Sequence, residues 1–471
     1  MSNGSPTYTN PIYPADFPDP FILRFNGCYY AYATSPQRVA AAGQLVFPML
    51  SSRDLVNWEE HGRALAAPDL PGIDAYWAPE VAYSNGKFYL YYAAGNDADP
   101  NHHLRVAVAE HPLGPWRDSG RNLTPGELFA IDAHPFRDPQ DGRWYLYYAR
   151  DSVAPPFAGT GLAVDELVTM EELAGTPREV LRPFADWQVF ELQRAIKQNL
   201  DWYTVEGPFV MRKGDRYVCF YSGGRWENPN YGVSYALADS PLGPWKEEVG
   251  FGGPPLLRTV PEVIGPGHNS VIVGPDLITE YIVYHGWDPT GTGRFPRIDR
   301  LTWDGCRPQV HGPTIAPQPA PRLGEVATWF DHGEPGPKWE ARGNWTAFDG
   351  GTGTLGAARL TLREPVSRFV AETSVRGLED AQGFGIAVGS LEVVFETDVL
   401  RCGERAVPLP AGFRRDVWHR LSLQRTDGTL TVTVDEYPTL RLPDSGEPAS
   451  LALLTGVGAV FSHFSLTRVQ G

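Results

Sequence analysis

A turn glycine followed by alternating aromatic residues occurs at Gly86-Lys-Phe-Tyr-Leu-Tyr-Tyr-Ala93. Related copies occur at Gly27-Cys-Tyr-Tyr-Ala-Tyr-Ala33, Gly142-Arg-Trp-Tyr-Leu-Tyr-Tyr-Ala149, Gly214-Asp-Arg-Tyr-Val-Cys-Phe-Tyr-Ser222 and Thr279-Glu-Tyr-Ile-Val-Tyr-His285. Short runs of aromatic and β-branched residues that begin at a tight turn are typical of β-strands. We therefore predict one strand at each copy.

The copies are spaced almost regularly along the chain. Steps between corresponding aromatic residues range from 56 to 73 residues, measured at Tyr30, Tyr91, Tyr147, Phe220 and Tyr284. A second repeated phrase supports this spacing, because Ala109-Glu-His-Pro-Leu-Gly-Pro-Trp116 matches Ala238-Asp-Ser-Pro-Leu-Gly-Pro-Trp245. Repeats of about 60 residues with several short strands are typical of β-propeller blades. The prediction is an all-β, five-bladed propeller whose inner strands meet at an axis.

The composition changes after these repeats. Of the 21 Tyr residues, 20 precede residue 327 and only Tyr437 follows it. Three prolines, Pro317, Pro319 and Pro321, favour an extended connection at this point. Alternating runs such as Thr429-Leu-Thr-Val-Thr-Val434 then indicate further strands. We predict three segments: a propeller catalytic domain over 1–316, a Pro-rich linker over 317–322, and a concanavalin-like or carbohydrate-binding β-sandwich over 323–471.

Composition and charge exclude several classes of protein. The formal charge of −16 opposes binding to nucleic acid and to anionic membrane surfaces, which need clustered basic residues. No apolar run approaches the ~20 residues that cross a bilayer. The N-terminus has neither the basic start nor the apolar stretch of a secretory signal, so we expect a cytoplasmic protein. The four Cys are far apart, which signals neither a zinc site nor a disulfide framework.

Three acidic residues precede aromatic strands of different repeats. Asp19 lies between two prolines, Asp132 lies in the apolar stretch Phe129–Phe136, and Glu206 precedes Gly-Pro. They lie 11, 15 and 14 residues before the corresponding aromatic markers. Because equivalent positions of a propeller meet at its axis, we expect the three carboxyl groups to lie close together. Each could instead be a turn residue or a buried, hydrogen-bonded acid.

Two carboxyl groups on opposite sides of a sugar can hydrolyse a glycosidic bond when one is protonated and the other is ionised. An apolar setting raises the pKa of a carboxyl group, and the neighbours of Glu206 are Val205, Gly207 and Pro208. An Asp and a Glu with different surroundings can divide the roles of base and acid. The three acids therefore predict a glycosidase.

The first part of the chain also resembles glycoside hydrolase family 43. The similarity rests on five motifs, Asn10-Pro-Ile-Tyr-Pro-Ala-Asp-Phe-Pro-Asp-Pro20, Tyr76-Trp-Ala-Pro-Glu-Val81, Ile131-Asp-Ala-His134, Val205-Glu-Gly-Pro208 and Gly265-Pro-Gly-His-Asn-Ser270. The resemblance implies a five-bladed propeller that inverts the anomeric centre. It also implies that Asp19 is the general base, that Asp132 tunes and orients the acid, and that Glu206 is the general acid.

The resemblance implies substrate-binding residues as well. His268 is expected at the axis, where it could hold a calcium or sodium ion through water or could be a structural histidine. Arg294 is expected to reach the sugar hydroxyls, with Arg297 as the alternative. Trp77 and Trp226 are expected to be stacking walls, although either could be a structural aromatic residue. No cofactor is expected to be required.

We predict an inverting exo-glycoside hydrolase, with α-L-arabinofuranosidase activity on arabino- or arabinoxylo-oligosaccharides as the first choice. A β-xylosidase and an endo-1,5-α-arabinanase are the alternatives within the family. Fructan-cleaving propellers share the motif Phe136-Arg-Asp-Pro139, but their other acidic motifs are absent. A carbohydrate-binding propeller without catalysis is the non-enzyme alternative. The sequence predicts neither the oligomeric state nor the role of the second domain.

Overall fold

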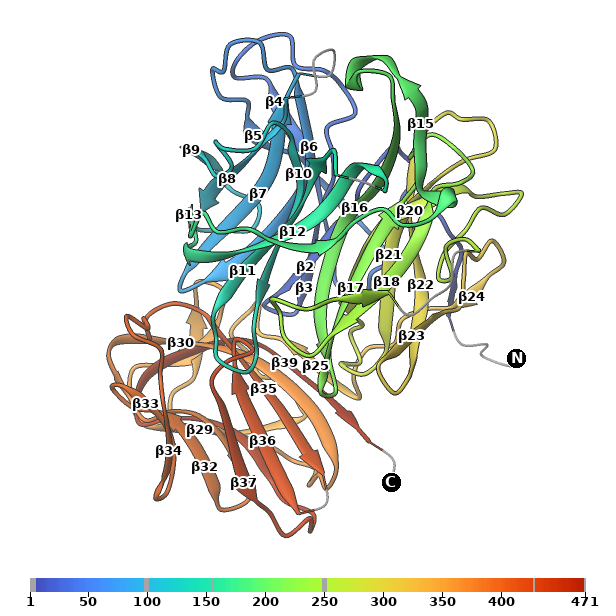
Figure 1. The fold of residues 1–471 in the computed structure, drawn as a ribbon. Helices are drawn as coiled ribbons and strands as arrows, with labels where there is room; N and C mark the ends of the chain where they lie inside the picture. Colours follow the sequence, from blue (N-terminus) through green and yellow to red (C-terminus); the bar gives the residue numbers. More distant parts are fainter. Residues whose placement is uncertain (1–5, 97–100, 155, 248–251, 427, 470–471) are drawn as a thin grey trace.

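The computed structural model describes residues 6–96, 101–154, 156–247, 252–426 and 428–469 (Figure 1). These residues form β-strands and loops with two short 3₁₀ turns, η1 (Asp186–Gln188) and η2 (Ala195–Lys197). The predicted all-β class is confirmed. Neither turn, nor any other helix in the described ranges, is long and apolar enough to cross a membrane.

Three sheets of the first part have four strands each, paired antiparallel in chain order. The first comprises β2 (Phe21–Phe25), β3 (Cys28–Tyr32), β4 (Leu45–Ser52) and β5 (Glu59–Ala66). The second comprises β6 (Ala75–Ser84), β7 (Lys87–Gly95), β8 (His103–Ala109) and β9 (Arg117–Asn122). The last comprises β20 (Ile264–Val273), β21 (Glu280–Trp287), β22 (Arg294–Asp304) and β23 (Arg307–Val310).

A ten-stranded sheet between them contains two further units. One comprises β10 (Ala130–Arg137), β11 (Trp144–Ser152), β12 (Ala158–Thr169), β13 (Glu172–Leu173) and β14 (Arg178–Leu181). The other comprises β15 (Val189–Arg194), β16 (Leu200–Lys213), β17 (Arg216–Gly223), β18 (Gly232–Ala238) and β19 (Lys246–Glu247). Parallel pairing of β12 with β16 joins the two units into one sheet.

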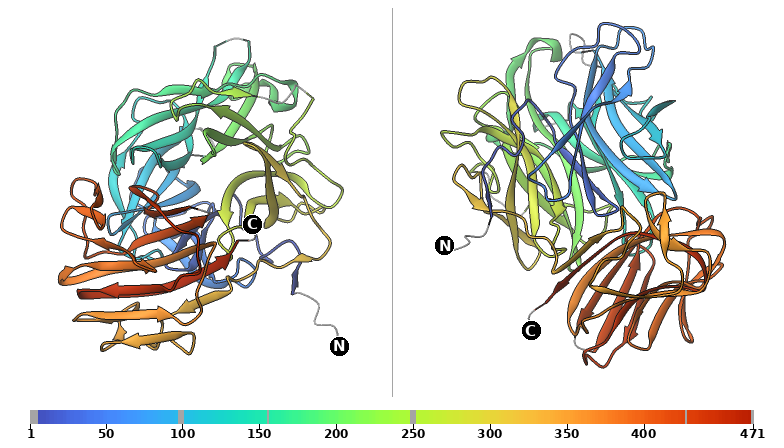
Figure 2. Two further views of the ribbon diagram at one scale, coloured as in Figure 1. Left: turned by 90° about the horizontal axis from the view of Figure 1, so that it is seen from below. Right: turned by 180° about the vertical axis from the view of Figure 1, so that it is seen from behind.

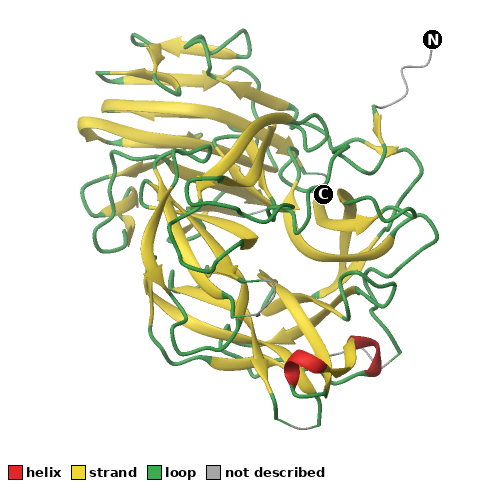
Figure 3. Ribbon diagram, turned by 90° about the horizontal axis from the view of Figure 1, so that it is seen from above, coloured by secondary structure: helices red, strands yellow, loops and turns green. Residues whose placement is uncertain are grey.

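The five units form a closed ring. Each first strand contacts the first strands of both neighbouring units, in the order β2, β6, β10, β16, β20 and again β2. Seen from above, the sheets surround a central axis (Figure 3). The N-terminal strand β1 (Thr7–Tyr8) pairs with β24 (Gln318–Pro319), so the Pro-rich segment is tied to the start of the chain.

Each predicted aromatic copy forms the second strand of its unit, namely β3, β7, β11, β17 or β21. The two repeated phrases interlock between units. Tyr32 Oη donates to the carbonyl of Pro112 at 2.6 Å, and Tyr147 Oη donates to the carbonyl of Pro241 at 2.6 Å. The rings of Trp116 and Trp245 pack edge-on against these same tyrosines. Burial of each aromatic ring stabilises the junction between adjacent units.

The second part has two sheets with one shared apolar core. One sheet contains β25 (Val326–Trp329), β27 (Thr346–Phe348), β28 (Gly351–Thr354), β30 (Phe369–Gln382), β35 (His419–Thr426), β36 (Thr429–Val434), β37 (Thr439–Pro443) and β39 (Val457–Arg468). The other contains β26 (Trp339–Arg342), β29 (Ala358–Leu362), β31 (Phe384–Val388), β32 (Leu391–Phe395), β33 (Val399–Cys402), β34 (Arg405–Pro408) and β38 (Leu451–Thr455).

These two sheets dock on one end of the ring (Figures 1 and 2). The turns between the first and second strands of the first three units make the contact. A Cβ atom added at the turn glycine would lie 2.5–2.7 Å from His463 at Gly27, Val417 at Gly86 and Tyr437 at Gly142. Only glycine therefore fits these close approaches, and the turn glycines of the repeat also form the junction between the two parts.

Candidate active site

The inner strands of the five units share an unusual backbone position. A residue with positive φ lies in four of these strands and just before β2, at Asp19 (54°), Ala78 (43°), Asp132 (60°), Gly207 (56°) and His268 (49°), and β20 has a second one at Gly265. Within β6, β10, β16 and β20 the ladder changes register at this residue, as at a β-bulge. Bulges re-aim side chains and are common next to active sites. The ring thus presents five equivalent positions to the axis.

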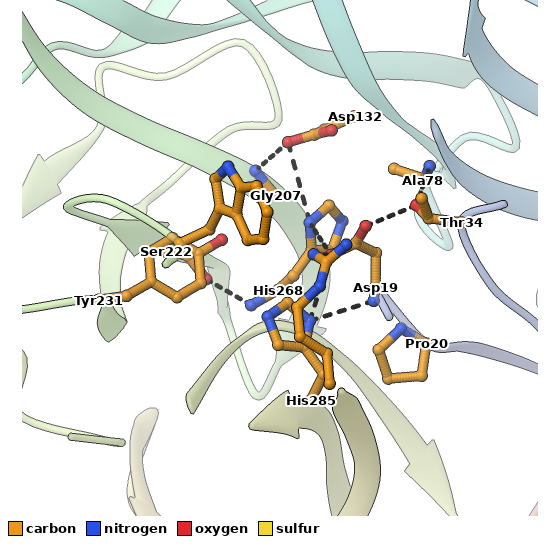
Figure 4. A network of polar contacts seen from close by, with 12 residues as sticks. Asp19, Pro20, Thr34, Ala78, Asp132, Gly207, Ser222, Tyr231, His268 and His285 are labelled. Carbon is orange, nitrogen blue, oxygen red and sulfur yellow. Dashed lines mark hydrogen bonds and ion pairs between the residues drawn. The ribbon is translucent and has the colours of Figure 1, made fainter. Parts of the chain in front are cut away.

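The predicted acids occupy these positions unequally. Asp132 lies at the bulge of β10 and Asp19 lies at the corresponding position just before β2, whereas Glu206 immediately precedes Gly207 at the bulge of β16. The two aspartates therefore occupy equivalent positions of their units, as expected. Glu206 lies one residue before the equivalent position of its unit. Even so, the polar contacts around Asp19, Asp132 and His268 form one network (Figure 4).

Asp19 is held by four side chains from distant parts of the chain. Thr34 donates to Oδ2 at 2.5 Å, and the Arg294 guanidinium lies 3.0 Å from Oδ1. His268 Nδ1 and His285 Nδ1 lie 3.4 and 3.2 Å from the same Oδ1. Burial favours a higher pKa for Asp19, but the positive charge of Arg294 and the nearby His268 outweigh it and hold this pKa well below its ordinary value. Asp19 is ionised.

His285 accepts a hydrogen bond at Nδ1 from the backbone N–H of Asp19, over 3.1 Å. This bond requires an unprotonated Nδ1. Burial lowers the pKa of His285 to about 4, which agrees with a neutral ring. His285 thus positions the backbone of Asp19 and contributes no charge near neutral pH.

Glu206 lies in the opposite electrostatic setting. Burial raises its pKa to about 7, and the negative charge of Asp19 adds to this shift. Tyr231 Oη donates to Glu206 Oε1 at 2.7 Å, which partly opposes the shift because the hydrogen bond stabilises the carboxylate. Near neutral pH, a protonated Glu206 can therefore coexist with an ionised Asp19.

Asp132 is connected directly to the backbone beside Glu206. The N–H of Gly207 donates to Asp132 Oδ2 at 3.0 Å. Burial, together with the charges of Glu206 and Asp19, holds the pKa of Asp132 well above its ordinary value. Asp132 can therefore orient the peptide bond between Glu206 and Gly207.

A pocket of about 480 Å³ opens at the end of the ring where Asp19, Asp132 and Glu206 lie. All seven residues proposed from sequence line it: Asp19, Trp77, Asp132, Glu206, Trp226, His268 and Arg294. The alternative Arg297 does not line the pocket; it is buried, and its Nη1 donates to the carbonyl of Thr314 at 3.5 Å. The geometry therefore favours Arg294 over Arg297 as the residue that faces a ligand.

Aromatic rings form two walls of the pocket. The Trp77 ring stacks on the buried His102 ring, with 3.7 Å between centroids. The Trp226 ring stacks on Trp287 at 5.8 Å, and the Arg294 guanidinium lies 4.5 Å from the Trp226 ring centroid. Sugar rings bind to such surfaces through their apolar C–H faces. Both predicted tryptophans are therefore placed to contact a ligand.

Sequence reasoning missed several residues at this site. Thr34, Tyr231, His285 and Trp287 were not singled out, although His285 ends the fifth aromatic copy and Tyr231 closes the stretch that contains Trp226. Three of the five equivalent positions are followed by proline, at Asp19-Pro20, Ala78-Pro79 and Gly207-Pro208. This repeated proline was the sequence signal that could have indicated them.

The axial ion was expected to bind His268 through water. His268 Nδ1 lies 3.4 Å from Asp19 and 4.0 Å from Asp132. The described part of the chain holds no group of three or more His, Cys, Asp or Glu side chains placed to bind a metal directly. These residues do not fit a directly coordinated metal, and an ion that His268 holds through water stays a prediction.

The chain belongs to glycosyl hydrolases family 43, whose sequence model matches residues 8–306. It is therefore a glycoside hydrolase. A beta-D-galactofuranosidase of Aspergillus niger is 30% identical over 62% of this chain and 81% of the relative. An extracellular exo-alpha-(1->5)-L-arabinofuranosidase of Streptomyces avermitilis is 27% identical over 64% of this chain and 62% of the relative.

Solved structures match in two ways. A thermostable family-43 glycoside hydrolase is 35% identical to this chain, with a TM-score of 0.57. The match covers 67% of this chain and 99% of the solved chain. A Bacteroides ovatus protein described as xyloglucan PUL GH43B covers 98% of this chain and 100% of its own, with a TM-score of 0.52 and 18% identity. This second likeness concerns the fold alone, and it extends over both parts of the chain.

Proposed function

We propose that the chain is an inverting, exo-acting α-L-arabinofuranosidase. Its five ring units are the blades of a β-propeller over residues 1–316, and residues 323–471 form a β-sandwich after the linker 317–322. The observation that carries the proposal is that two acids with opposite surroundings line one pocket: Asp19 beside the Arg294 guanidinium, which lowers its pKa, and Glu206 in a buried setting, which raises its pKa. Inverting glycosidases require this division between an ionised base and a protonated acid.

In the proposed reaction, the ionised Asp19 removes a proton from a water molecule that attacks the anomeric carbon. Glu206 donates its proton to the glycosidic oxygen as the bond to the leaving sugar breaks. Asp132 orients the acid through the N–H of Gly207. Inversion requires room for the water, with the two carboxyl groups roughly 6.5–9.5 Å apart. Arg294 and the walls formed by Trp77 and Trp226 hold the sugar between them.

The names of the relatives support a furanoside as the substrate. The two relatives described above are a galactofuranosidase and an arabinofuranosidase, and a second arabinofuranosidase is 28% identical over 82% of its length. We retain arabinofuranose in arabino- or arabinoxylo-oligosaccharides as the first choice. A β-D-galactofuranoside becomes the second candidate because the 30% identical relative carries that name. The β-xylosidase and endo-arabinanase alternatives stay open.

The test compares aryl α-L-arabinofuranoside, β-D-galactofuranoside and β-D-xyloside with wild type and with Glu206→Ala. We expect the aryl arabinofuranoside to be cleaved fastest of the three. On α-1,5-arabinobiose, whose sugar leaving group needs protonation, Glu206→Ala should reduce kcat/KM by about 100- to 10,000-fold. Proton NMR of the first product should show the inverted anomer. Retention of configuration, or full activity of the variant, would overturn the assigned roles.

We propose that the enzyme needs no cofactor and acts in the cytoplasm on small oligosaccharides. The cytoplasmic location contrasts with the extracellular arabinofuranosidase of Streptomyces avermitilis. Fractionation of the producing cells would test it.

A further inference from the structure

One rim of the pocket is built by the segment between β14 and β16. This segment contains η1, β15 and η2. Strand β15 pairs antiparallel with β16, with Val189 opposite Tyr203 and Glu191 opposite Trp202. Because β16 also carries Glu206, the segment lies beside the strand of the proposed acid. In Figure 1, β15 stands at the end of the ring away from the C-terminal sheets.

Four side chains of the segment line the pocket: Phe190, Arg194, Ile196 and Lys197. Lys197 already has a partner, because its Nζ lies 2.5 Å from Asp151 Oδ2 and both side chains are more than four-fifths buried. Asp151 also accepts a hydrogen bond from Thr160 at 3.1 Å. This ion pair anchors the segment to the neighbouring unit. Arg194 is the other cationic side chain of the segment that lines the pocket.

Arg194 has an unused donor. Its Nε is buried and has no hydrogen-bond partner among the residues that the structure describes. The nearest carboxylate oxygen in an ion pair with it, Glu191 Oε2, lies 3.6 Å away, which is too long for a good hydrogen bond. The guanidinium packs 4.4 Å from the centroid of the Phe190 ring. Because this Nε is shielded from solvent, a ligand in the pocket would be bound through the Nη atoms of the guanidinium.

The position of Arg194 relative to Glu206 indicates what that ligand is. Arg194 ends β15, which pairs with β16, and β16 carries Glu206, so the two side chains reach the pocket from adjacent strands. The acid protonates the glycosidic oxygen, and the leaving sugar must therefore lie on the side of the acid. A cation beside an aromatic and an aliphatic wall matches a sugar ring, which has hydroxyl edges and apolar faces.

We propose that Arg194 determines specificity for the leaving sugar, by donating hydrogen bonds to its hydroxyl oxygens while Phe190 and Ile196 contact its apolar face. This inference rests on the proposed function, because it places the leaving group next to Glu206. It predicts that the enzyme selects oligosaccharides over glycosides of small alcohols. The terminal sugar, whose anomeric carbon is attacked, binds in the deeper part of the pocket. Binding of this terminal sugar does not depend on Arg194.

The experiment measures binding in the Glu206→Gln protein, so that no turnover interferes. Titration calorimetry is run with arabinose, α-1,5-arabinotriose and an arabinosyl-substituted xylotriose, with and without Arg194→Ala. We expect Arg194→Ala to weaken binding of an oligosaccharide by about tenfold or more and to leave arabinose binding unchanged. Arg194→Lys should restore part of the affinity because it keeps the charge.

Arg225→Ala is the matched control. Its guanidinium lies 5.1 Å from the same Phe190 ring, but Arg225 does not line the pocket. This variant should bind every probe as the parent does. Equal weakening of arabinose and oligosaccharide, unchanged oligosaccharide affinity in Arg194→Ala, or no binding of either oligosaccharide would overturn the inference.

Hydrolysis by the otherwise native enzyme separates the two proposals. If the wild type cleaves none of the substrates while Glu206→Gln binds oligosaccharide through Arg194, the proposed function fails and the leaving-group role fails with it, although Arg194 is then shown to bind oligosaccharide. If the wild type is active, kcat/KM of Arg194→Ala should fall about tenfold for oligosaccharide and stay near the wild-type value for aryl arabinofuranoside. An equal fall for both substrates would contradict the inference.

Discussion

Arg294 Nη1 lies 3.0 Å from Asp19 Oδ1, across a sequence separation of 275 residues. Arg294 begins β22 in the last unit of the ring, and Asp19 lies just before β2 in the first. The pair exists only because the ring closes. Closing the fold therefore also sets the charge of the proposed general base.

Removal of Arg294 should change the pH dependence of the reaction. Its charge opposes the effect of burial on the pKa of Asp19, so Arg294→Ala raises that pKa. A base with a raised pKa is protonated at higher pH, and the acidic limb of kcat/KM should move upward, with about a tenfold loss per pH unit below the new pKa. Arg300→Ala, at an exposed arginine of the same strand, should keep the wild-type profile. An unmoved acidic limb in Arg294→Ala would contradict this role.

Tyr231 should control the alkaline limb. Its hydroxyl stabilises the ionised form of Glu206, whose pKa is about 7. Wild-type activity should therefore decline as pH rises through about 7, because the acid loses its proton. In Tyr231→Phe the pKa of Glu206 rises further, and the decline should begin at higher pH. A pH profile of kcat/KM checks this, and a shift to lower pH would rule out the proposed hydrogen-bond effect.

Glu372 should stabilise the junction between the two parts. It forms a buried ion pair with Arg24 and lies 3.1 Å from His463 Nε2. Burial favours a higher pKa, but the charge of Arg24 holds the pKa of Glu372 well below its ordinary value. Glu372→Gln leaves Arg24 buried and unpaired, so urea unfolding at pH 7 should show a loss of about 3–5 kcal/mol.

The pH dependence of this loss follows from the depressed pKa. The contribution of Glu372 is fully present above the unfolded-state value of 4.5 and declines as pH falls below it. The difference between wild type and Glu372→Gln should therefore shrink at pH 4. Glu364→Gln, which alters an exposed ion pair with Arg468, should change stability by less than about 1 kcal/mol. A constant difference between pH 7 and pH 4 would contradict the assignment.

The turn glycines provide a test of the docked geometry. Gly86→Ala places a Cβ 2.5 Å from Val417 Cγ1, whereas Gly214→Ala at the corresponding turn of the fourth unit meets nothing within 4 Å. Both glycines have positive φ, so each variant loses about 1–2 kcal/mol from the backbone alone. Gly86→Ala should lose more, while its kcat/KM stays unchanged because the pocket is at the other end of the ring. Equal losses in the two variants would argue against the contact.

Much of this arrangement follows from local sequence rules. Alternating aromatic residues after a turn predict strands wherever they occur, and their repetition predicts equivalent units. The acidic motifs, read together, indicate the residues that line one pocket. The one-residue displacement of Glu206 relative to Asp132 was not predicted, because the turns that join the first and second strands differ in length: His134 pairs with Tyr147, whereas Phe209 pairs with Phe220. An offset counted along the chain therefore does not fix a position on the inner strand.

The partners of the acids could not be predicted. Thr34, Tyr231 and His285 are ordinary strand and loop residues in the sequence, and their contacts depend on how five units pack around one axis. The segment that carries Arg194 shows no sequence repeat, so nothing local indicates which rim of the pocket it builds.

The sequence alone determined the strands, the repeat and the identity of the three acids, because these depend on side-chain chemistry and short-range turn geometry. Only the tertiary structure decided which acid is ionised. Ring closure brings the charge of Arg294 to Asp19, while burial beside Asp19 raises the pKa of Glu206. Protonation depends on desolvation and on distances between residues far apart in the chain, and those exist only in the folded ring.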